Sequence, residues 1–131
     1  MAAGFDYNRM NLLLAVLEKR EGLYFSNLDT YINIIGGLRL DEPAADLAVA
    51  MALVSALRDI PVDDETMVFG EIGLSGEIRS VSRVASRIAE ASRLGFKRCI
   101  VPKSSLKNLP QNIDIEVIGV KTLKEALAFI R

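Results

Sequence analysis

The chain has 131 residues, half of them hydrophobic and a quarter charged, a composition typical of one globular domain. It contains no histidine and a single cysteine, Cys99, which excludes a Ser-His-Asp triad, a Cys-His pair, an internal disulfide and a zinc site built from several cysteines. The formal net charge of −1 gives by itself no indication of nucleic-acid or membrane binding.

The first half of the chain shows helical and strand patterns in turn. They predict a helix over 7–20, a strand over 30–35, and a helix that begins around Pro43 and runs to about Arg58. Asp6 is a suitable cap for the first helix and Gly22 a suitable end. Asp41 and Glu42 would face the positive end of the second long helix.

The second half continues the alternation. The predicted elements are a strand over 67–72, a glycine-punctuated hairpin, a helix over 82–94, strands over 98–101 and 113–119, and a helix over 122–130 capped by Thr122. Gly70, Gly73 and Gly76 resemble a nucleotide loop, but no Gly-Lys-Ser/Thr ending follows, so a turn between two strands is the better interpretation. The alternation predicts an α/β fold in one domain over 1–131.

The charges divide unevenly along the chain. Residues 1–78 carry five basic and thirteen acidic side chains, whereas residues 79–131 carry eleven basic and four acidic ones. We expect Arg83 and Arg87, four residues apart, to share one helix face. That face is either a solvated surface or a phosphate-binding stripe, and the scarcity of aromatic residues argues against base stacking. The densest basic stretch contains Arg79, Arg83, Arg87, Arg93, Lys97, Arg98, Lys103 and Lys107.

Two segments carry a family resemblance. GGLRLDEPAADLAVAMALVSALRD (36–59) and VFGEIGLSGEIRSVSRVASRIAEASRLGFKRCIVP (68–102) resemble the C-terminal domain of the bacterial RadA (Sms) family of DNA repair proteins, as does the opening GFDYNRMNLLLAVLEKREGL. That domain is similar to the proteolytic domain of Lon protease. The resemblance therefore implies the ribosomal protein S5 domain 2-like α/β fold over the whole chain.

In RadA proteins this domain follows a zinc finger and a RecA-like ATPase domain. The chain contains neither a Walker motif nor a cysteine cluster, so we expect it to be a fragment. The resemblance implies that ATP, magnesium and zinc bind in those other domains, with no cofactor or metal in this one.

The resemblance to Lon also allows a check of its serine–lysine dyad, which needs no histidine. The Lon serine lies in a D-G-P-S-A-G run, and the matching residues 41–46 place Ala44 at the serine and Asp46 at a glycine. The Lon lysine lies in a G-G-L-K run, and residues 82–85 place Ala85 there. The resemblance therefore implies a domain without peptidase activity.

Other residues with reactive side chains have plainer interpretations. Asp41, Glu42 and Asp46 could form a metal site, but acids at a helix start are stabilised by the helix dipole alone. Cys99, within a predicted strand, is expected to be a small buried hydrophobe rather than a reactive thiol. Turn or surface positions are expected for the four candidate serines, Ser75, Ser80, Ser82 and Ser86.

The family acts in recombinational repair as a hexameric DNA-dependent ATPase that promotes branch migration. The resemblance implies that this domain scaffolds the ring and binds the DNA phosphate backbone. Arg39 and Arg79 match basic positions of the family's GG-x-[KR] and GE-[IV]-R runs, and Arg83 and Arg87 are the next candidates. Lys97, Arg98, Lys103 and Lys107 are weaker ones.

The expected partners are DNA, further copies of the chain, and the recombinase RecA through the parent protein. The longest apolar run, 47–54, is too short for a membrane span and no signal peptide is present, so we expect a bacterial cytoplasmic protein. Two alternatives stay open. One is an oligomerisation module without DNA contact, and the other is a Lon-type peptidase with an unrecognised nucleophile.

Overall fold

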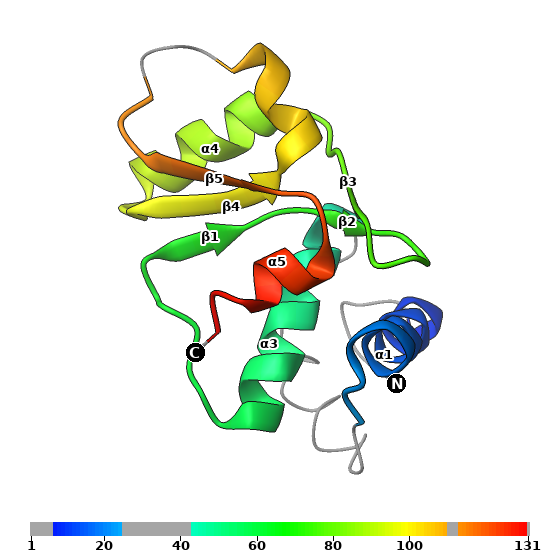
Figure 1. Cartoon of the computed structure of the whole chain (residues 1–131). Helices are drawn as coiled ribbons and strands as arrows, with labels where there is room; N and C mark the ends of the chain where they lie inside the picture. Colours follow the sequence, from blue (N-terminus) through cyan, green and yellow to red (C-terminus); the bar gives the residue numbers. More distant parts are fainter. Residues whose placement is uncertain (1–6, 25–42, 110–112, 131) are drawn as a thin grey trace.

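The computed structural model describes residues 7–24, 43–109 and 113–130 (Figure 1). The expected strand over 30–35, the cap Asp6, and Arg39, Asp41 and Glu42 lie outside these ranges. The elements in chain order are α1 (Tyr7–Glu21), the 3-10 turn η1 (Pro43–Ala45), α3 (Asp46–Arg58), β1 (Thr66–Val68), β2 (Glu71–Ile72), β3 (Ile78–Arg79), α4 (Val84–Arg93), β4 (Arg98–Pro102), the 3-10 helix η2 (Lys103–Asn108), β5 (Glu116–Val120) and α5 (Leu123–Leu127).

The centre of the fold is a parallel sheet in the order β1-β4-β5, in which Cys99 lies opposite Met67 on one side and Val117 on the other. Helix α4 covers one face of this sheet, and α3 and α5 lie on the other (Figure 1). Strand β4 is therefore buried on both faces, as central strands of parallel sheets usually are. These observations confirm the α/β class and the single small domain.

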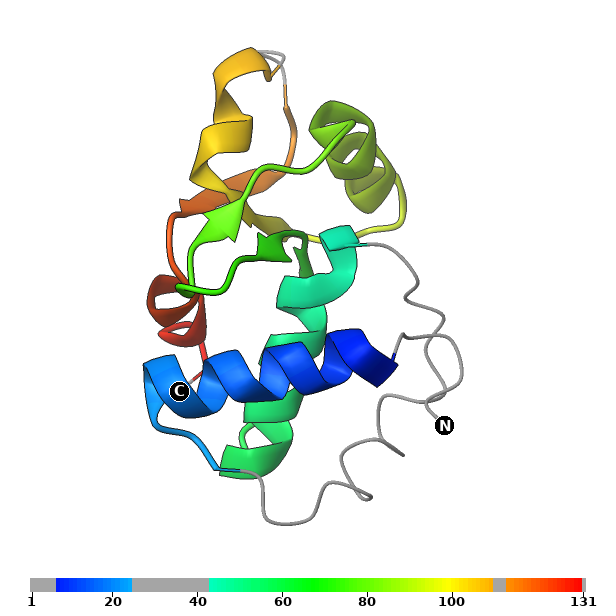
Figure 2. The same cartoon turned by 90° about the vertical axis from the view of Figure 1, so that its right-hand side faces the viewer.

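The larger part of the core lies between α1 and α3. Met10, Leu13 and Leu17 are spaced at helical intervals along α1 and are almost fully buried against the main core cluster. Figure 2 shows α1 crossing α3, with the β2–β3 hairpin above the crossing. Among the described residues, no helix combines the length and apolar character needed to cross a membrane.

Several predicted start and stop signals are confirmed. Gly22 ends α1 with a φ of 68°, and Gly95 follows α4 with a φ of 95°, a left-handed conformation that glycine adopts without strain. Thr122 caps α5, because its Oγ1 accepts a hydrogen bond from the Glu125 backbone N–H at 3.2 Å.

The predicted strand over 67–72 is wrong as a single element. It is divided into β1, in the parallel sheet, and β2, which pairs with β3 in an antiparallel hairpin. The chain leaves the sheet at Gly70, whose backbone N–H donates to the Ala44 carbonyl at 2.8 Å. A Cβ at Gly70 would lie 2.9 Å from Ile78 Cγ2, so this close approach depends on glycine.

The glycine-rich segment after β2 is a turn between two strands, as expected. The Gly73 N–H donates to the Glu77 carbonyl at 2.9 Å, and Gly76 has a φ of 81°. The remaining predicted bounds shift by a few residues, because helix and strand ends are weakly specified by local pattern. Helix α3 follows a 3-10 turn, α4 begins at Val84 rather than at residue 82, β5 spans Glu116–Val120, and α5 ends at Leu127.

Gly119 controls how closely η2 packs on β5, and this leads to the first prediction. A Cβ at residue 119 would lie 2.6 Å from Leu106 Cδ1 and 3.2 Å from the Lys103 Cα, so in Gly119→Ala the Leu106 side chain must change conformation and η2 must shift slightly away from β5. We expect the free energy of unfolding in urea to fall by about 1–2 kcal/mol, the usual cost of overpacking. Ser104→Ala, at an exposed position of η2, is the control, and an equal effect of both changes would contradict the packing argument.

Candidate functional site

Ala44, the residue at the expected serine position, lies in η1 at the wall of a pocket of about 220 Å³. Ala85 lies in the first turn of α4 and lines a different cavity of about 240 Å³, between α4 and residues 113–115. The structure thus places the two alanines against two separate cavities. The pocket beside Ala44 is lined by Pro43, Ala44, Glu71, Ser80, Val81, Ser82 and Arg87.

The pocket beside Ala44 offers hydroxyl groups but, among the described residues, no lysine to act as their base. Ser80 and Ser82 line it. Arg87 is the one cationic side chain in its described lining, and a guanidinium stays protonated and cannot take a proton from a serine. Ser75 and Ser86 are exposed and lie outside this lining. The described residues therefore do not form a serine–lysine pair here.

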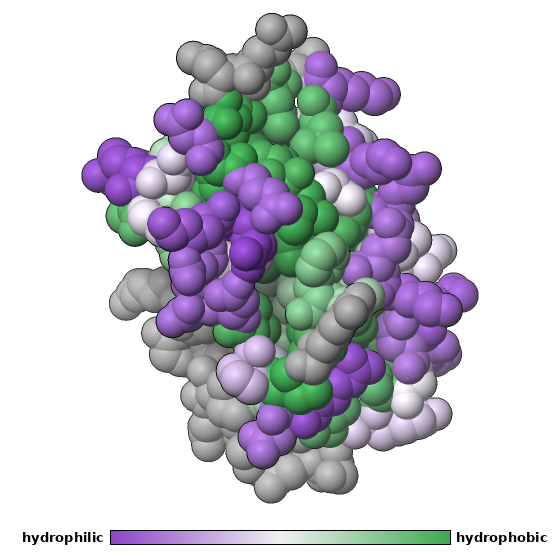
Figure 3. Space-filling model, turned by 60° about the vertical axis from the view of Figure 1, so that its left-hand side comes forward, coloured by the Kyte–Doolittle hydropathy of each residue, from purple (hydrophilic) through white to green (hydrophobic). Residues whose placement is uncertain are grey.

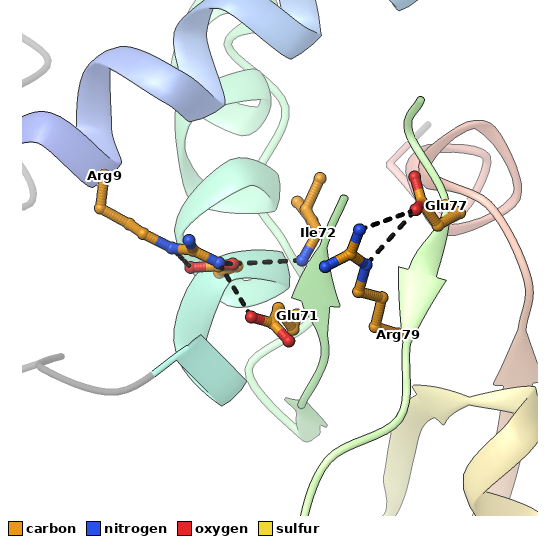
Figure 4. A network of polar contacts seen from close by, with 6 residues as sticks. Arg9, Glu71, Ile72, Glu77 and Arg79 are labelled. Carbon is orange, nitrogen blue, oxygen red and sulfur yellow. Dashed lines mark hydrogen bonds and ion pairs between the residues drawn. The ribbon is translucent and has the colours of Figure 1, made fainter. Parts of the chain in front are cut away.

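Arg79, the first described candidate for DNA binding, ends strand β3 and is exposed. Its Nε and Nη2 both lie 3.3 Å from Glu77 Oε2, as Figure 4 shows. The hairpin also holds Glu77 in place. Hydrogen bonds from the backbone N–H groups of Glu77 and Ser75 lower the pKa of its carboxyl group, and the hydrogen bond from Arg79 contributes less. This exposed ion pair fixes the direction of the guanidinium without burying it.

Arg83 and Arg87 do not share a helix face, so that expectation is wrong. Arg83 precedes α4 and has a φ of 54°, a left-handed backbone conformation outside the helix. Arg87 lies within α4 and is half-buried, with its Nε donating to the Ser82 carbonyl at 2.9 Å and its guanidinium 5.8 Å from the centre of the Phe69 ring. Arg83 projects from an exposed turn, whereas Arg87 contributes to the wall of the pocket.

The four weaker candidates for DNA binding divide between the two ends of the parallel sheet. Lys97 and Arg98 lie at the amino end of β4, and Arg98 forms ion pairs with Asp63 and with Glu116, the latter at 3.3 Å. The pKa of Asp63 is lowered mainly by a hydrogen bond from the Glu65 backbone N–H, and to a lesser extent by the positive charge of Arg98. Figure 3 shows hydrophilic side chains beside a strip of apolar surface on the side of the molecule that carries this end of the sheet.

Lys103 and Lys107 lie at the opposite, carboxyl end of β4, on η2. Figure 2 shows η2, in yellow-orange, on one side of the β2–β3 hairpin and α4 on the other. The structure therefore places Lys103 and Lys107 beside the hairpin that carries Arg79, since both line one groove with Ile78, and it places Lys97 and Arg98 at the other end of the sheet.

The sequence analysis missed the buried ion pair of Asp46. This carboxylate is fully buried at the start of α3. It accepts hydrogen bonds from Arg9 Nε at 2.9 Å, from Arg9 Nη2, and from the Ile72 backbone N–H at 3.1 Å (Figure 4). Arg9 Nη2 also lies 3.4 Å from Glu71 Oε2. Asp46 thus has a structural role. The one feature of the sequence that could have indicated this role is the acidic residue at a position where the Lon run has a glycine.

Cys99 is fully buried in β4, as expected. Burial raises the pKa of its thiol to about 11, because an apolar environment disfavours the charged thiolate. A thiol of this kind is a poor nucleophile and a poor metal ligand at neutral pH.

Comparison with known proteins gives two findings. The family described as subunit ChlI of Mg-chelatase matches residues 12–105. DNA repair protein RadA of Bacillus subtilis and that of Listeria monocytogenes are each 50% identical to this chain over 127 residues, 97% of its length. RadA of Streptococcus pneumoniae is 50% identical over 124 residues. The chain spans 28% of the first two relatives and 30% of the third.

The Asp46 contacts predict a large effect of removing their cation. In Arg9→Met the carboxylate of Asp46 stays buried without a counter-charge, so we expect the free energy of unfolding to fall by about 3 kcal/mol. Urea unfolding followed by circular dichroism measures this. Lys19→Met, an exposed change on the same helix, is the control and should alter stability by less than about 0.5 kcal/mol. Equal stability of the two variants would show that the ion pair is not needed.

The environment of Cys99 predicts slow thiol chemistry. At pH 8 only about one thousandth of this thiol is ionised, and the folded chain shields it. We expect Ellman's reagent to modify Cys99 at the rate of unfolding, so the rate should rise steeply as urea approaches the unfolding midpoint. Rapid stoichiometric modification of the folded chain would instead reveal an accessible thiolate.

Proposed function

The chain belongs to the family described as subunit ChlI of Mg-chelatase, and from this premise and the RadA relatives we propose that it is the Lon-like domain of a bacterial RadA-type DNA repair protein. In this role it is a non-proteolytic domain of the ribosomal protein S5 domain 2 type. It supports a six-membered ring in the cytoplasm and binds the DNA backbone, while the other domains of the parent protein hydrolyse ATP.

One observation carries the DNA-binding part of this proposal. Arg79 and Arg83 are exposed on neighbouring segments, one at the end of the hairpin and one in the turn before α4. Beside them lies a pocket with serine hydroxyls but without a lysine in its described lining. Cations on exposed turns suit phosphate groups, which are contacted without reading the base sequence. Arg39 remains a proposed contact on the resemblance alone.

The lack of a base beside the serines supports a role without proteolysis. A serine nucleophile needs a neighbouring group that takes its proton, and Arg87 cannot do so at neutral pH. A serine-reactive fluorophosphonate probe tests this point. Stoichiometric labelling of the chain, abolished by Ser80→Ala or Ser82→Ala, would revive the peptidase alternative.

A second candidate function is favoured by the placement of charge. Asp63, Asp64 and Glu65 are exposed just before β1, at the amino end of the sheet, and Lys103 and Lys107 lie beyond its carboxyl end. Opposite charges at opposite ends suit head-to-tail contacts between copies, the kind of contact from which rings are built. On this alternative the chain is an oligomerisation module, and its assembly rather than DNA binding is sensitive to salt.

The DNA-binding proposal predicts a measurable loss in Arg79→Ala. Fluorescence anisotropy of a labelled DNA duplex across a salt series gives the affinity and its salt dependence. We expect weaker binding at every salt concentration and a slope of log K against log[salt] that is smaller by about one, because one phosphate contact is lost. Arg58→Ala, an exposed arginine at the end of α3, is the matched control and should keep the slope of the unaltered chain. If the unaltered chain binds no DNA even at low salt, the DNA-binding part is wrong.

A further inference from the structure

A groove of about 580 Å³ lies beyond the carboxyl end of the parallel sheet. Its apolar floor is formed by Ile78, Leu106 and Val120. Three lysines, Lys103, Lys107 and Lys121, stand around this floor, and all three are exposed. The groove therefore combines an apolar base with three cations from two separate segments of the chain.

The backbone around this groove is held firmly. The Ile78 N–H donates to the Lys121 carbonyl at 2.8 Å, which fixes β3 beside the end of β5. The Val81 N–H donates to Ser105 Oγ at 3.3 Å, which ties the chain after β3 to η2. The close contact of Gly119 with Leu106 seats η2 on β5. The three lysines thus project from a fixed frame, as a preorganised binding surface requires.

The charge of the groove is not balanced within the described part of the chain. No described carboxylate or aromatic ring lines it, and none of the three lysines forms an ion pair with a described residue. Two acids lie close by along the chain, and both are engaged. Glu125 accepts the Lys121 backbone N–H at 3.1 Å, and Glu77 pairs with Arg79. The lysines are thus available to an anionic partner, and base stacking has no platform here.

The groove adjoins the surface already proposed to bind DNA. Ile78, in its floor, directly precedes Arg79 in β3, so the strand that carries Arg79 also forms part of the groove. We propose that Lys103, Lys107 and Lys121 form a second set of phosphate contacts, which extends the Arg79 surface along the carboxyl end of the sheet and holds the sugar–phosphate backbone of DNA. This inference rests on the proposed function, and it assigns a role to Lys121, for which the sequence pattern gave no indication.

The test compares charge-matched variants of the 131-residue chain in the same anisotropy titration with a labelled DNA duplex. Each lost phosphate contact removes about 0.9 from the salt slope, so Lys103→Ala/Lys107→Ala should lower it by about 1.8 and Lys121→Ala by about 0.9. Lys103→Arg/Lys107→Arg keeps both charges and should keep the slope. Lys19→Ala/Arg58→Ala removes two exposed cations away from the groove, neither of them a candidate DNA contact, and should also leave the slope unchanged.

The outcomes separate this inference from the proposed function. If Arg79→Ala weakens binding but Lys103→Ala/Lys107→Ala behaves like the Lys19→Ala/Arg58→Ala control, the inference is wrong and the proposed function stands. If the unaltered chain does not bind the duplex, both are wrong. The solution mass of each variant is measured in parallel by light scattering. In a further outcome, a groove variant no longer forms oligomers while each chain binds DNA with unchanged affinity. This result would show that the groove makes contacts between copies of the chain, and it would overturn the inference.

Discussion

A single buried carboxylate determines how the segments of this chain fit together. Asp46 is fully buried, and a buried charge must be paired and hydrogen-bonded to be tolerated. Its partners, Arg9 and the Ile72 N–H, are 37 and 26 residues away in the sequence. Satisfying this one group therefore brings together α1, the start of α3 and the β2–β3 hairpin. The same three segments also share the main hydrophobic core cluster, so the ion pair and apolar packing act on one junction.

The position of the hairpin in turn decides where the positive charges lie. Once β3 is fixed beside Lys121, Ile78 of that strand and the lysines of η2 line one groove at the carboxyl end of the sheet. The acids just before β1 lie at the other end, because parallel strands all run the same way. Arg98 shows how partners decide the role of a cation: it belongs to the basic stretch of the sequence, yet Asp63 and Glu116 neutralise it. The net charge of −1 thus conceals a polarity along the strand direction.

Local chemistry made most of the fold predictable, and long-range contacts account for the rest. Apolar residues at helical spacing predicted α1, and Gly22, with its positive φ, predicted where it ends. The hydroxyl group of Thr122 predicted where α5 begins. The single strand expected over 67–72 failed because the chain turns away at Gly70 to bond Ala44, a partner 26 positions earlier. The shared face of Arg83 and Arg87 failed because the helix begins one residue after Arg83. For the candidate site, the family resemblance indicated Arg79 and the basic stretch of the sequence included Lys103 and Lys107, whereas grouping these lysines with Lys121 in one groove required the tertiary fold.

The segment around Ala44 is held to Gly70, just before β2, by backbone hydrogen bonds. The Ala44 carbonyl accepts the Gly70 N–H at 2.8 Å and the Gly70 carbonyl accepts the Leu47 N–H at 3.0 Å, so the backbone beside the pocket is firmly held. Asp46, at the position of a glycine in the Lon run, contributes the buried ion pair instead. Restoring a serine at residue 44 would add a hydroxyl to a pocket whose described base is an arginine, while residue 85 faces another cavity. Ala44 and Asp46 therefore contribute to this segment through packing and a buried ion pair, and neither supplies a nucleophile or a base to the described lining of the pocket.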